Sequence, residues 1–148
     1  MNVDQLIQRE LMEYENDSEL EFAVDPIDGD LHNLRITLPG PQGTPYEEGN
    51  FFLLFNLPSN YPKGNPKIKF ETKIYHPTIS PDGRICCCFF DFISKYSYTI
   101  KQLMNLIINL LKDPSIGCPY NSQVHAEFAT AHAKFEKTAR EWTMEYAV

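Results

Sequence analysis

Three consecutive cysteines, Cys86, Cys87 and Cys88, are the residues of this sequence best suited to covalent chemistry. They lie in the segment GRICCCFFDF, between the glycine of a predicted turn and two phenylalanines. A cysteine thiolate is a strong nucleophile, and its thioesters release the acyl group readily to an amine or to another thiol. The segment therefore indicates either a nucleophilic cysteine or a set of small buried side chains, because free cysteines are most often buried and inert.

The spacing of the four cysteines argues against a disulfide framework and against a zinc site. Three of them are adjacent, and no second Cys or His pair lies at zinc-finger spacing. His125 and His132 are seven positions apart, but no further residue joins them at a metal-binding spacing, so we expect solvated surface histidines. The sequence predicts reduced thiols, no metal and no cofactor.

The composition predicts one domain that covers residues 1–148, with 43% hydrophobic residues for a single core. A net charge of −7 argues against nucleic acid or an anionic membrane as the main partner. The most apolar stretch, Leu103 to Leu111, is far shorter than the roughly 20 residues of a membrane span, and the N-terminal residues lack the apolar core of a signal peptide. We expect a soluble cytoplasmic protein, with the nucleus as a further compartment.

Apolar periodicity predicts an α+β fold that begins with a helix and four strands. Apolar residues at steps of three and four from Val3 to Tyr14 indicate a helix that ends near residues 15–17. Apolar runs then predict strands at 20–24, 34–38, 51–57 and 68–70. Because only short turns separate these runs, we expect an antiparallel meander and not a βαβ series.

The second half of the chain is predicted to hold a long loop and more helices. Residues 72–98 lack periodicity, and so long a loop in a compact domain is usually functional. Thr99 to Lys112 is apolar almost all round, which indicates a central, covered helix. An aromatic stripe from Phe128 to Tyr146 predicts two C-terminal helices with a break near 129–132. The three thiols lie inside the long loop.

Four segments of the chain resemble the ubiquitin-conjugating enzymes, in the order and at the spacing of that family. They are GPQGTPYEEGNFFL (40–53), YPKGNPKIKF (61–70), KIYHPTISPDGRIC (73–86) and AREWTMEYAV (139–148). The resemblance spans nearly the whole chain and implies the family fold: a helix, a four-stranded meander, an active-site loop, a central helix and two C-terminal helices. It also implies a transferase that carries ubiquitin or a ubiquitin-like modifier as a thioester.

The resemblance selects Cys86 as the catalytic cysteine, because it follows a Gly-x-Ile turn and lies ten positions after His76 of the family's His-Pro-Asn motif. It implies that His76 and Pro77 brace the active-site loop, with a role of His76 as a base the less favoured alternative. Thr78 replaces the Asn of the motif, which supports the oxyanion or its loop. A threonine hydroxyl reaches less far, and losing an oxyanion donor costs about 10²–10³ in rate elsewhere.

Cys118 stands where many family members carry an acidic residue that orients or deprotonates the incoming lysine. A thiol there removes the attraction for an ammonium group and the nearby proton acceptor. Whether transfer to lysine survives is therefore open, whereas transfer to a cysteine needs neither. Two other interpretations of Cys118 are a plain structural cysteine, which we favour, and a reversible, inactivating disulfide with Cys86.

The expected partner surfaces also depart from the family. Members present basic residues on the first helix to the activating enzyme, whereas this helix offers Gln5 and a single basic residue, Arg9. The ligase-facing loops normally hold an aromatic residue after Tyr-Pro and a Ser-Pro-Ala motif; here Lys63 and a KYSY segment with Tyr96 and Ser97 stand instead. The expected partners are ubiquitin or a ubiquitin-like protein, an activating enzyme and a ligase of uncertain type.

Three functions remain open from the sequence. An active carrier on Cys86, which hands the modifier to a substrate lysine or a ligase cysteine, is favoured because family members that become adaptors typically lose the cysteine. A non-catalytic variant that acts as a binding or adaptor module is the alternative, supported by Thr78, Cys118 and Lys63. A redox sensor rests on the thiol cluster alone and ranks third.

Overall fold

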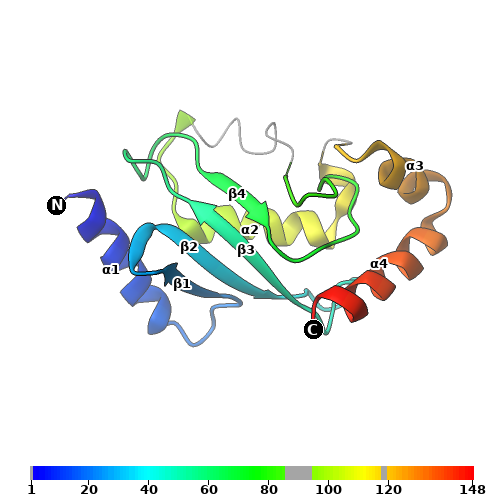
Figure 1. Ribbon diagram of the computed structural model, residues 1–148, viewed down its shortest axis with the longest axis horizontal. Coiled ribbons are helices and arrows are strands. Elements are labelled where there is room, and N and C mark those ends of the chain that lie inside the picture. Colours follow the sequence, from blue (N-terminus) through cyan, green and yellow to red (C-terminus); the bar gives the residue numbers. More distant parts are fainter. Residues whose placement is uncertain (1, 86–94, 118–119) are drawn as a thin grey trace.

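The computed structural model describes residues 2–85, 95–117 and 120–148, and its helices and strands follow the apolar periodicity of the sequence (Figure 1). The elements are α1 (Val3–Glu15), β1 (Ala23–Ile27), β2 (Asp30–Pro39), β3 (Asn50–Asn56), β4 (Lys67–Phe70), α2 (Ile100–Lys112), the 3₁₀ helix η3 (Pro114–Ile116), α3 (Ser122–Thr130) and α4 (His132–Tyr146). The predicted α+β fold, with its meander between helices, is confirmed.

The four strands form one antiparallel sheet in the order β1-β2-β3-β4. Ile36 of β2 pairs with Leu53 of β3, and side-chain alternation turns both into the core. The predicted first strand at 20–24 begins too early, because β1 starts at Ala23. The apolar alternation before β1 has another cause: Phe22 lies in the loop between α1 and β1, where it is buried and packs edge-on against Tyr14 of α1.

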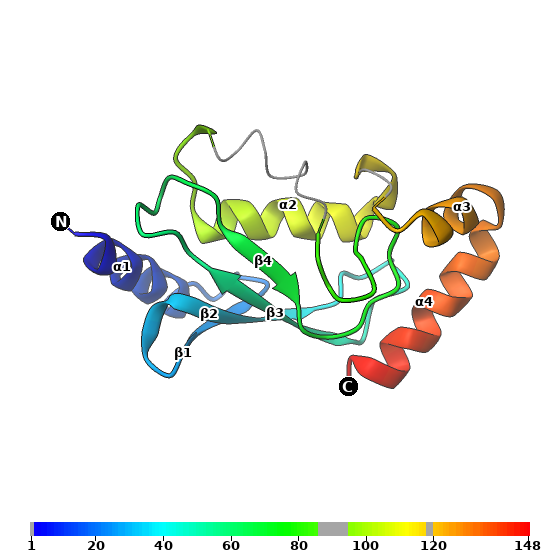
Figure 2. The same cartoon turned by 45° about the horizontal axis from the view of Figure 1, so that its top comes forward.

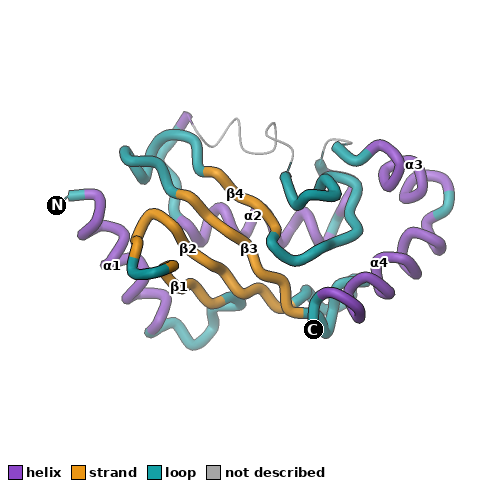
Figure 3. The backbone as a smooth tube through the Cα atoms, in the orientation of Figure 1, coloured by secondary structure: helices purple, strands orange, loops and turns teal. Residues whose placement is uncertain are grey.

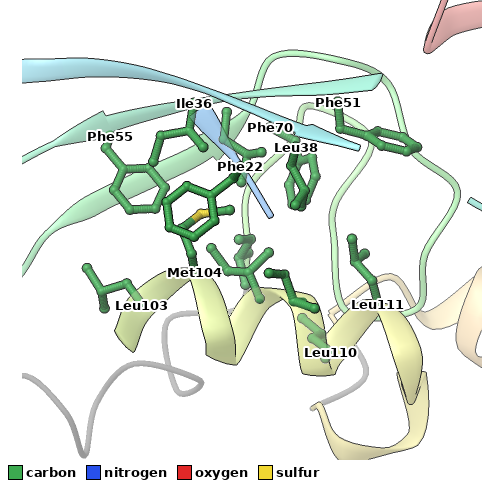
Figure 4. Packing of buried hydrophobic residues seen from close by; sticks show 14 of the residues in the cluster. Phe22, Ile36, Leu38, Phe51, Phe55, Phe70, Leu103, Met104, Leu110 and Leu111 are labelled. Carbon is green, nitrogen blue, oxygen red and sulfur yellow. The ribbon is translucent and has the colours of Figure 1, made fainter. Parts of the chain in front are cut away.

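The core lies between the sheet and α2, which covers one face of it (Figure 2). Thr99 and Gln102 form a capping box that starts α2. Leu103 and Met104 point from the helix toward the aromatic and aliphatic side chains of the strands (Figure 4). The sequence predicted a covered helix, but only the face of α2 toward the sheet is buried. Asn105 and Asn109 on the opposite side are exposed.

The two C-terminal helices extend beyond the end of the sheet (Figure 3). The predicted break is confirmed, because α3 ends at Thr130 and α4 begins at His132. Phe135 is buried at the junction, and its ring lies 5.1 Å from that of Phe128. No helix in the three described stretches is long and apolar enough to cross a membrane.

Candidate active site

The chain approaches position 86 through a tight turn that is fixed to the end of β4. Gly83 donates its N–H to the carbonyl of Ser80 at 2.9 Å, and its own carbonyl accepts the N–H of Phe70 at 2.8 Å. The φ of Gly83 is +91°, which favours glycine, and a Cβ there would lie 2.1 Å from the Phe70 carbonyl oxygen. Only glycine fits this approach, so the predicted Gly-x-Ile turn has a physical reason.

His76 is fully buried, and the backbone occupies both of its ring nitrogens. Nδ1 accepts the backbone N–H of Thr78 at 3.0 Å, so the ring proton lies on Nε2, which donates to the carbonyl of Leu110 at 3.0 Å. Burial lowers the pKa of His76 to about 4. The neutral ring thus ties the loop to α2 and has no lone pair left to act as a base, a geometry suited to the bracing role.

Thr78 has a fully buried side chain, and its hydroxyl has no hydrogen-bond partner in the described part of the chain. The hydroxyl lies against the backbone of Gly117, where an added Cβ would approach its oxygen to 2.3 Å. It faces protein backbone in this arrangement, and an orphan hydroxyl of this kind costs about 1–3 kcal/mol. Thr78, which stands in place of the Asn of the family motif, therefore carries a hydroxyl donor that does not reach the surface.

The four cysteines, Cys86, Cys87, Cys88 and Cys118, lie outside the described residues. Their interpretation as nucleophile, core filler or partner in a disulfide stays a prediction. Within residues 2–85, 95–117 and 120–148, no group of His, Cys, Asp or Glu side chains is arranged to hold a metal ion. His132 instead lies 3.2 Å from the Glu136 carboxylate on the surface of α4.

The predicted contact residues of α1 are engaged within the helix itself. Gln5 closes a capping box, accepting the N–H of Asn2 at 3.1 Å while its own N–H donates to the Asn2 side chain at 2.8 Å. Arg9 lies 3.7 Å from Glu13, and both side chains are exposed. Glu13 offsets the one basic charge of this helix, and the exposed Asp4 and Glu15 leave its outer surface acidic toward an activating enzyme.

The two predicted ligase-facing loops, which hold Lys63 in one and Tyr96 and Ser97 in the other, meet at one tip of the molecule. Tyr98 joins them, because its N–H donates to the carbonyl of Pro62 at 2.9 Å and its hydroxyl donates to the carbonyl of Gly64 at 2.9 Å. Lys63, Ser97 and Tyr96 are exposed, Tyr96 by 69%. The structure thus brings the three residues together, as a shared contact surface requires.

Sequence reasoning missed Glu10, a nearly buried carboxylate on α1. It accepts hydrogen bonds from the hydroxyls of Tyr14 and Tyr61 and, at 2.8 Å, from the backbone N–H of Ile100 at the start of α2. Desolvation and the Glu10 carboxylate raise the pKa of both tyrosines. A signal was available, since Glu10 interrupts the apolar stripe of α1 three positions after Ile7.

Comparison with known proteins gives one family and several similar structures. A family model described as "Ubiquitin-conjugating enzyme" matches residues 6–143. The E2 domain of a ubiquitin conjugating enzyme from Toxoplasma gondii is 33% identical, with a TM-score of 0.86, and the match covers 97% of this chain and 98% of that one. A provisionally assigned ubiquitin conjugating enzyme from Plasmodium yoelii is 35% identical, with a TM-score of 0.88 and coverage of 100% and 97%.

Proposed function

Because this chain belongs to the ubiquitin-conjugating enzyme family, we propose that it accepts ubiquitin or a ubiquitin-like modifier as a thioester on Cys86 and passes it to a substrate lysine or to a ligase cysteine. One observation carries the proposal. The turn at residues 80–85 is locked to β4 in a geometry that only glycine permits, and a cysteine follows it directly in the sequence. Such a turn fixes the backbone up to Ile85, the residue that directly precedes the proposed nucleophile in the sequence.

The proposed chemistry is a pair of acyl transfers. The Cys86 thiolate attacks the carbonyl carbon of the modifier's thioester on the activating enzyme, and that enzyme's cysteine leaves as a thiolate. A lysine amine or a ligase thiolate then attacks the new thioester, and the Cys86 thiolate leaves. Attack by an amine also requires the loss of a proton from nitrogen, whereas attack by a thiolate does not.

Two described residues, His76 and Thr78, and the identity of residue 118 favour the thiol route. His76 is neutral, buried and bonded at both nitrogens, so it has no means of taking a proton from an incoming lysine. Thr78 presents its hydroxyl to the protein interior and not to solvent. Cys118 supplies no carboxylate at the position where many family members carry one. Transfer to a ligase cysteine depends on none of these groups.

A non-catalytic adaptor is the alternative, and Thr78 and Cys118 are the features that favour it. In that case the chain would keep the family fold and bind ubiquitin or a conjugating enzyme without forming a thioester. The acidic outer surface of α1 and the tip that holds Lys63 would then serve binding alone. Both functions use the same fold, so a direct test of thioester formation separates them.

The test incubates the chain with ATP, an activating enzyme and ubiquitin, and follows adducts by non-reducing electrophoresis and mass spectrometry. We expect a ubiquitin adduct that reductant removes, that is absent in Cys86→Ala and that becomes resistant to reductant in Cys86→Ser, where an oxygen ester forms. Cys87→Ala and Cys88→Ala are matched controls and should be charged normally. An adduct that persists in Cys86→Ala, or no adduct with ubiquitin or ubiquitin-like modifiers, would contradict the proposal.

A further inference from the structure

A groove of about 330 Å³ lies between the turn at residues 45–48 and the last turns of α4, and it has no role in the chemistry above. Apolar surface from Pro45, Met144 and Ala147 lines it, and its charged lining residues are Glu47, Glu48 and Arg140. The end of α4 lies beside the start of β3, whereas α1 and the loop before β4 lie toward the other end of the molecule (Figure 1). A partner in this groove would therefore leave the expected surfaces for an activating enzyme and a ligase uncovered.

Hydrogen bonds between the turn and α4 form this groove before any partner binds. The Thr143 hydroxyl donates to the Pro45 carbonyl at 3.2 Å, and the Asn50 N–H donates to the Ala147 carbonyl at 2.9 Å. Gly49 allows the close approach of the two segments, because a Cβ there would lie 2.5 Å from the Thr143 methyl carbon. A groove held in this way loses little conformational entropy when it binds a segment.

Glu48, in the same turn, has a backbone conformation that suits glycine, with a φ of +71°. Its side chain is exposed, and its carboxylate forms no hydrogen bond or ion pair with the described residues. The neighbouring Glu47, in contrast, accepts the Gly43 N–H at 2.9 Å and lies 3.8 Å from Arg140. Backbone strain that no contact of the described residues explains is typical of binding sites.

The charges around the groove favour a cation. Glu47 and Glu48 outnumber Arg140, and the pair of Arg140 with Glu47 is exposed and therefore weak. The last turn of α4 holds Glu145 and no basic residue, although the backbone carbonyls already make a helix C-terminus partly negative. The net charge of −7 adds a long-range attraction for a basic partner.

We propose that this groove binds a segment of a partner protein in which a basic residue and a large apolar residue are neighbours. The basic side chain pairs with the Glu48 carboxylate near the C-terminal end of α4. The apolar side chain packs against Pro45, Met144 and Ala147. The binding requires no thioester, so it goes beyond the proposed function and does not depend on it.

The test measures binding of a fluorescein-labelled peptide of alternating arginine and leucine to the full, uncharged chain by fluorescence anisotropy. One counterpart has glutamine at each arginine and another has serine at each leucine, and both should bind about tenfold more weakly. Met144→Ser should weaken binding of the first peptide about threefold. Met12→Ser on α1 is the matched control, because Met12 is 62% exposed and Met144 77%, and it should leave the affinity unchanged.

Glu48→Gly separates binding from folding. Relief of the backbone strain should raise the Tm by about 3 °C, while loss of the carboxylate should weaken binding of the arginine–leucine peptide about threefold. A residue with only a structural role would not combine these two effects. Asp28→Gly removes an equal charge at another non-glycine position of positive φ, 52°, and should leave the affinity unchanged.

Equal losses of affinity in Glu48→Gly and Asp28→Gly would overturn the inference, because net charge alone would then attract the peptide. Equal affinity of the arginine and glutamine peptides, or no loss in Met144→Ser, would overturn it as well. Nuclear magnetic resonance supplies the location: amide shifts should gather at residues 45–49 and 143–148, and shifts confined to other residues would contradict the site. Sedimentation that shows the chain alone to associate through these residues would assign the groove to a second copy instead.

Discussion

The carboxylate of Glu10 on α1 accepts a hydrogen bond of 2.8 Å from the backbone N–H of Ile100, the first residue of α2. The same carboxylate accepts the hydroxyls of Tyr14 and Tyr61. A negative charge at a helix N-terminus interacts favourably with the helix dipole and satisfies a backbone donor that has no partner within the helix. Glu10 therefore links α1, the loop before β4 and α2 through one group.

Replacement of Glu10 should destabilise the fold strongly. Glu10→Ala leaves the buried Tyr61 hydroxyl, the partly buried Tyr14 hydroxyl and a helix N–H without their acceptor, so we expect the free energy of unfolding to fall by about 3–5 kcal/mol. Glu13→Ala on the same helix removes only an exposed partner of Arg9 and should change it by less than about 0.5 kcal/mol. Urea unfolding measures both, and equal losses would refute the structural role of Glu10.

Gly83 should resist substitution more than other glycines of positive φ. In Gly83→Ala the new Cβ meets the Phe70 carbonyl oxygen at 2.1 Å, so we expect a loss of about 3 kcal/mol and slower charging of Cys86. Gly43→Ala has a similar φ of +81° but nothing within 4 Å of its Cβ, and should cost about 1 kcal/mol. Thermal unfolding and the thioester assay measure both variants, and similar losses would show that φ alone sets the cost.

Local patterns explain which parts of this fold are predictable from the sequence. The helix of Val3–Glu15 and the alternation in β2 are local signals, and both were predicted. The start of β1 was predicted wrongly because Phe22 alternates like a strand residue while it fills the core from a loop. The period of a pattern shows that a side chain is buried, but not which element carries it.

The site was less accessible to sequence reasoning because its contacts are long-range. Glu10 bonds to Tyr61 and Ile100 across 51 and 90 positions of the chain. The link from His76 to Leu110 spans 34 positions. No local sequence pattern predicts such long-range hydrogen bonds. The sequence therefore indicated that His76 supports the loop, but not that its ring donates to the Leu110 carbonyl. The resemblance to a family indicated the candidate site residues, and the structure shows the hydrogen bonds of those candidates that lie among the described residues.

His76 should make the fold sensitive to acid. Burial lowers its pKa from 6.5 to about 4, so between these values the unfolded chain binds more protons than the folded chain. Its contribution to stability is therefore complete above pH 6.5 and is lost as the pH falls toward 4, a change of about 3 kcal/mol. Urea unfolding from pH 7 to pH 4 should show this slope, which His76→Gln should reduce.

The titration of the His76 ring is an independent check that does not require a stable variant. Nuclear magnetic resonance should show a neutral ring with its proton on Nε2 throughout the range above about pH 5. A His76 ring that gains a proton between pH 7 and pH 5 would contradict the burial and the two backbone bonds.

Thr78→Val should leave stability unchanged or raise it by about 1 kcal/mol, because valine has nearly the same shape and removes a buried hydroxyl that has no partner among the described residues. Thr44→Val is the matched control: the Thr44 hydroxyl is buried, donates to the Pro41 carbonyl at 2.6 Å and accepts the Tyr46 N–H at 3.2 Å. That variant should lose about 1–3 kcal/mol. If Thr78→Val is destabilised as much as Thr44→Val, the Thr78 hydroxyl has a partner that matters.

Cys118→Asp tests which acceptor the charged chain prefers. A carboxylate at this position would attract an ammonium group and accept its proton, so we expect free lysine to discharge the Cys86 thioester about tenfold faster, while free cysteine discharges it at the original rate. Ile116→Asp, at an exposed position of η3, adds the same charge nearby and should leave lysine discharge unchanged. Equal acceleration by both aspartates would assign the effect to general charge, and no acceleration by Cys118→Asp would show that residue 118 does not face the amine.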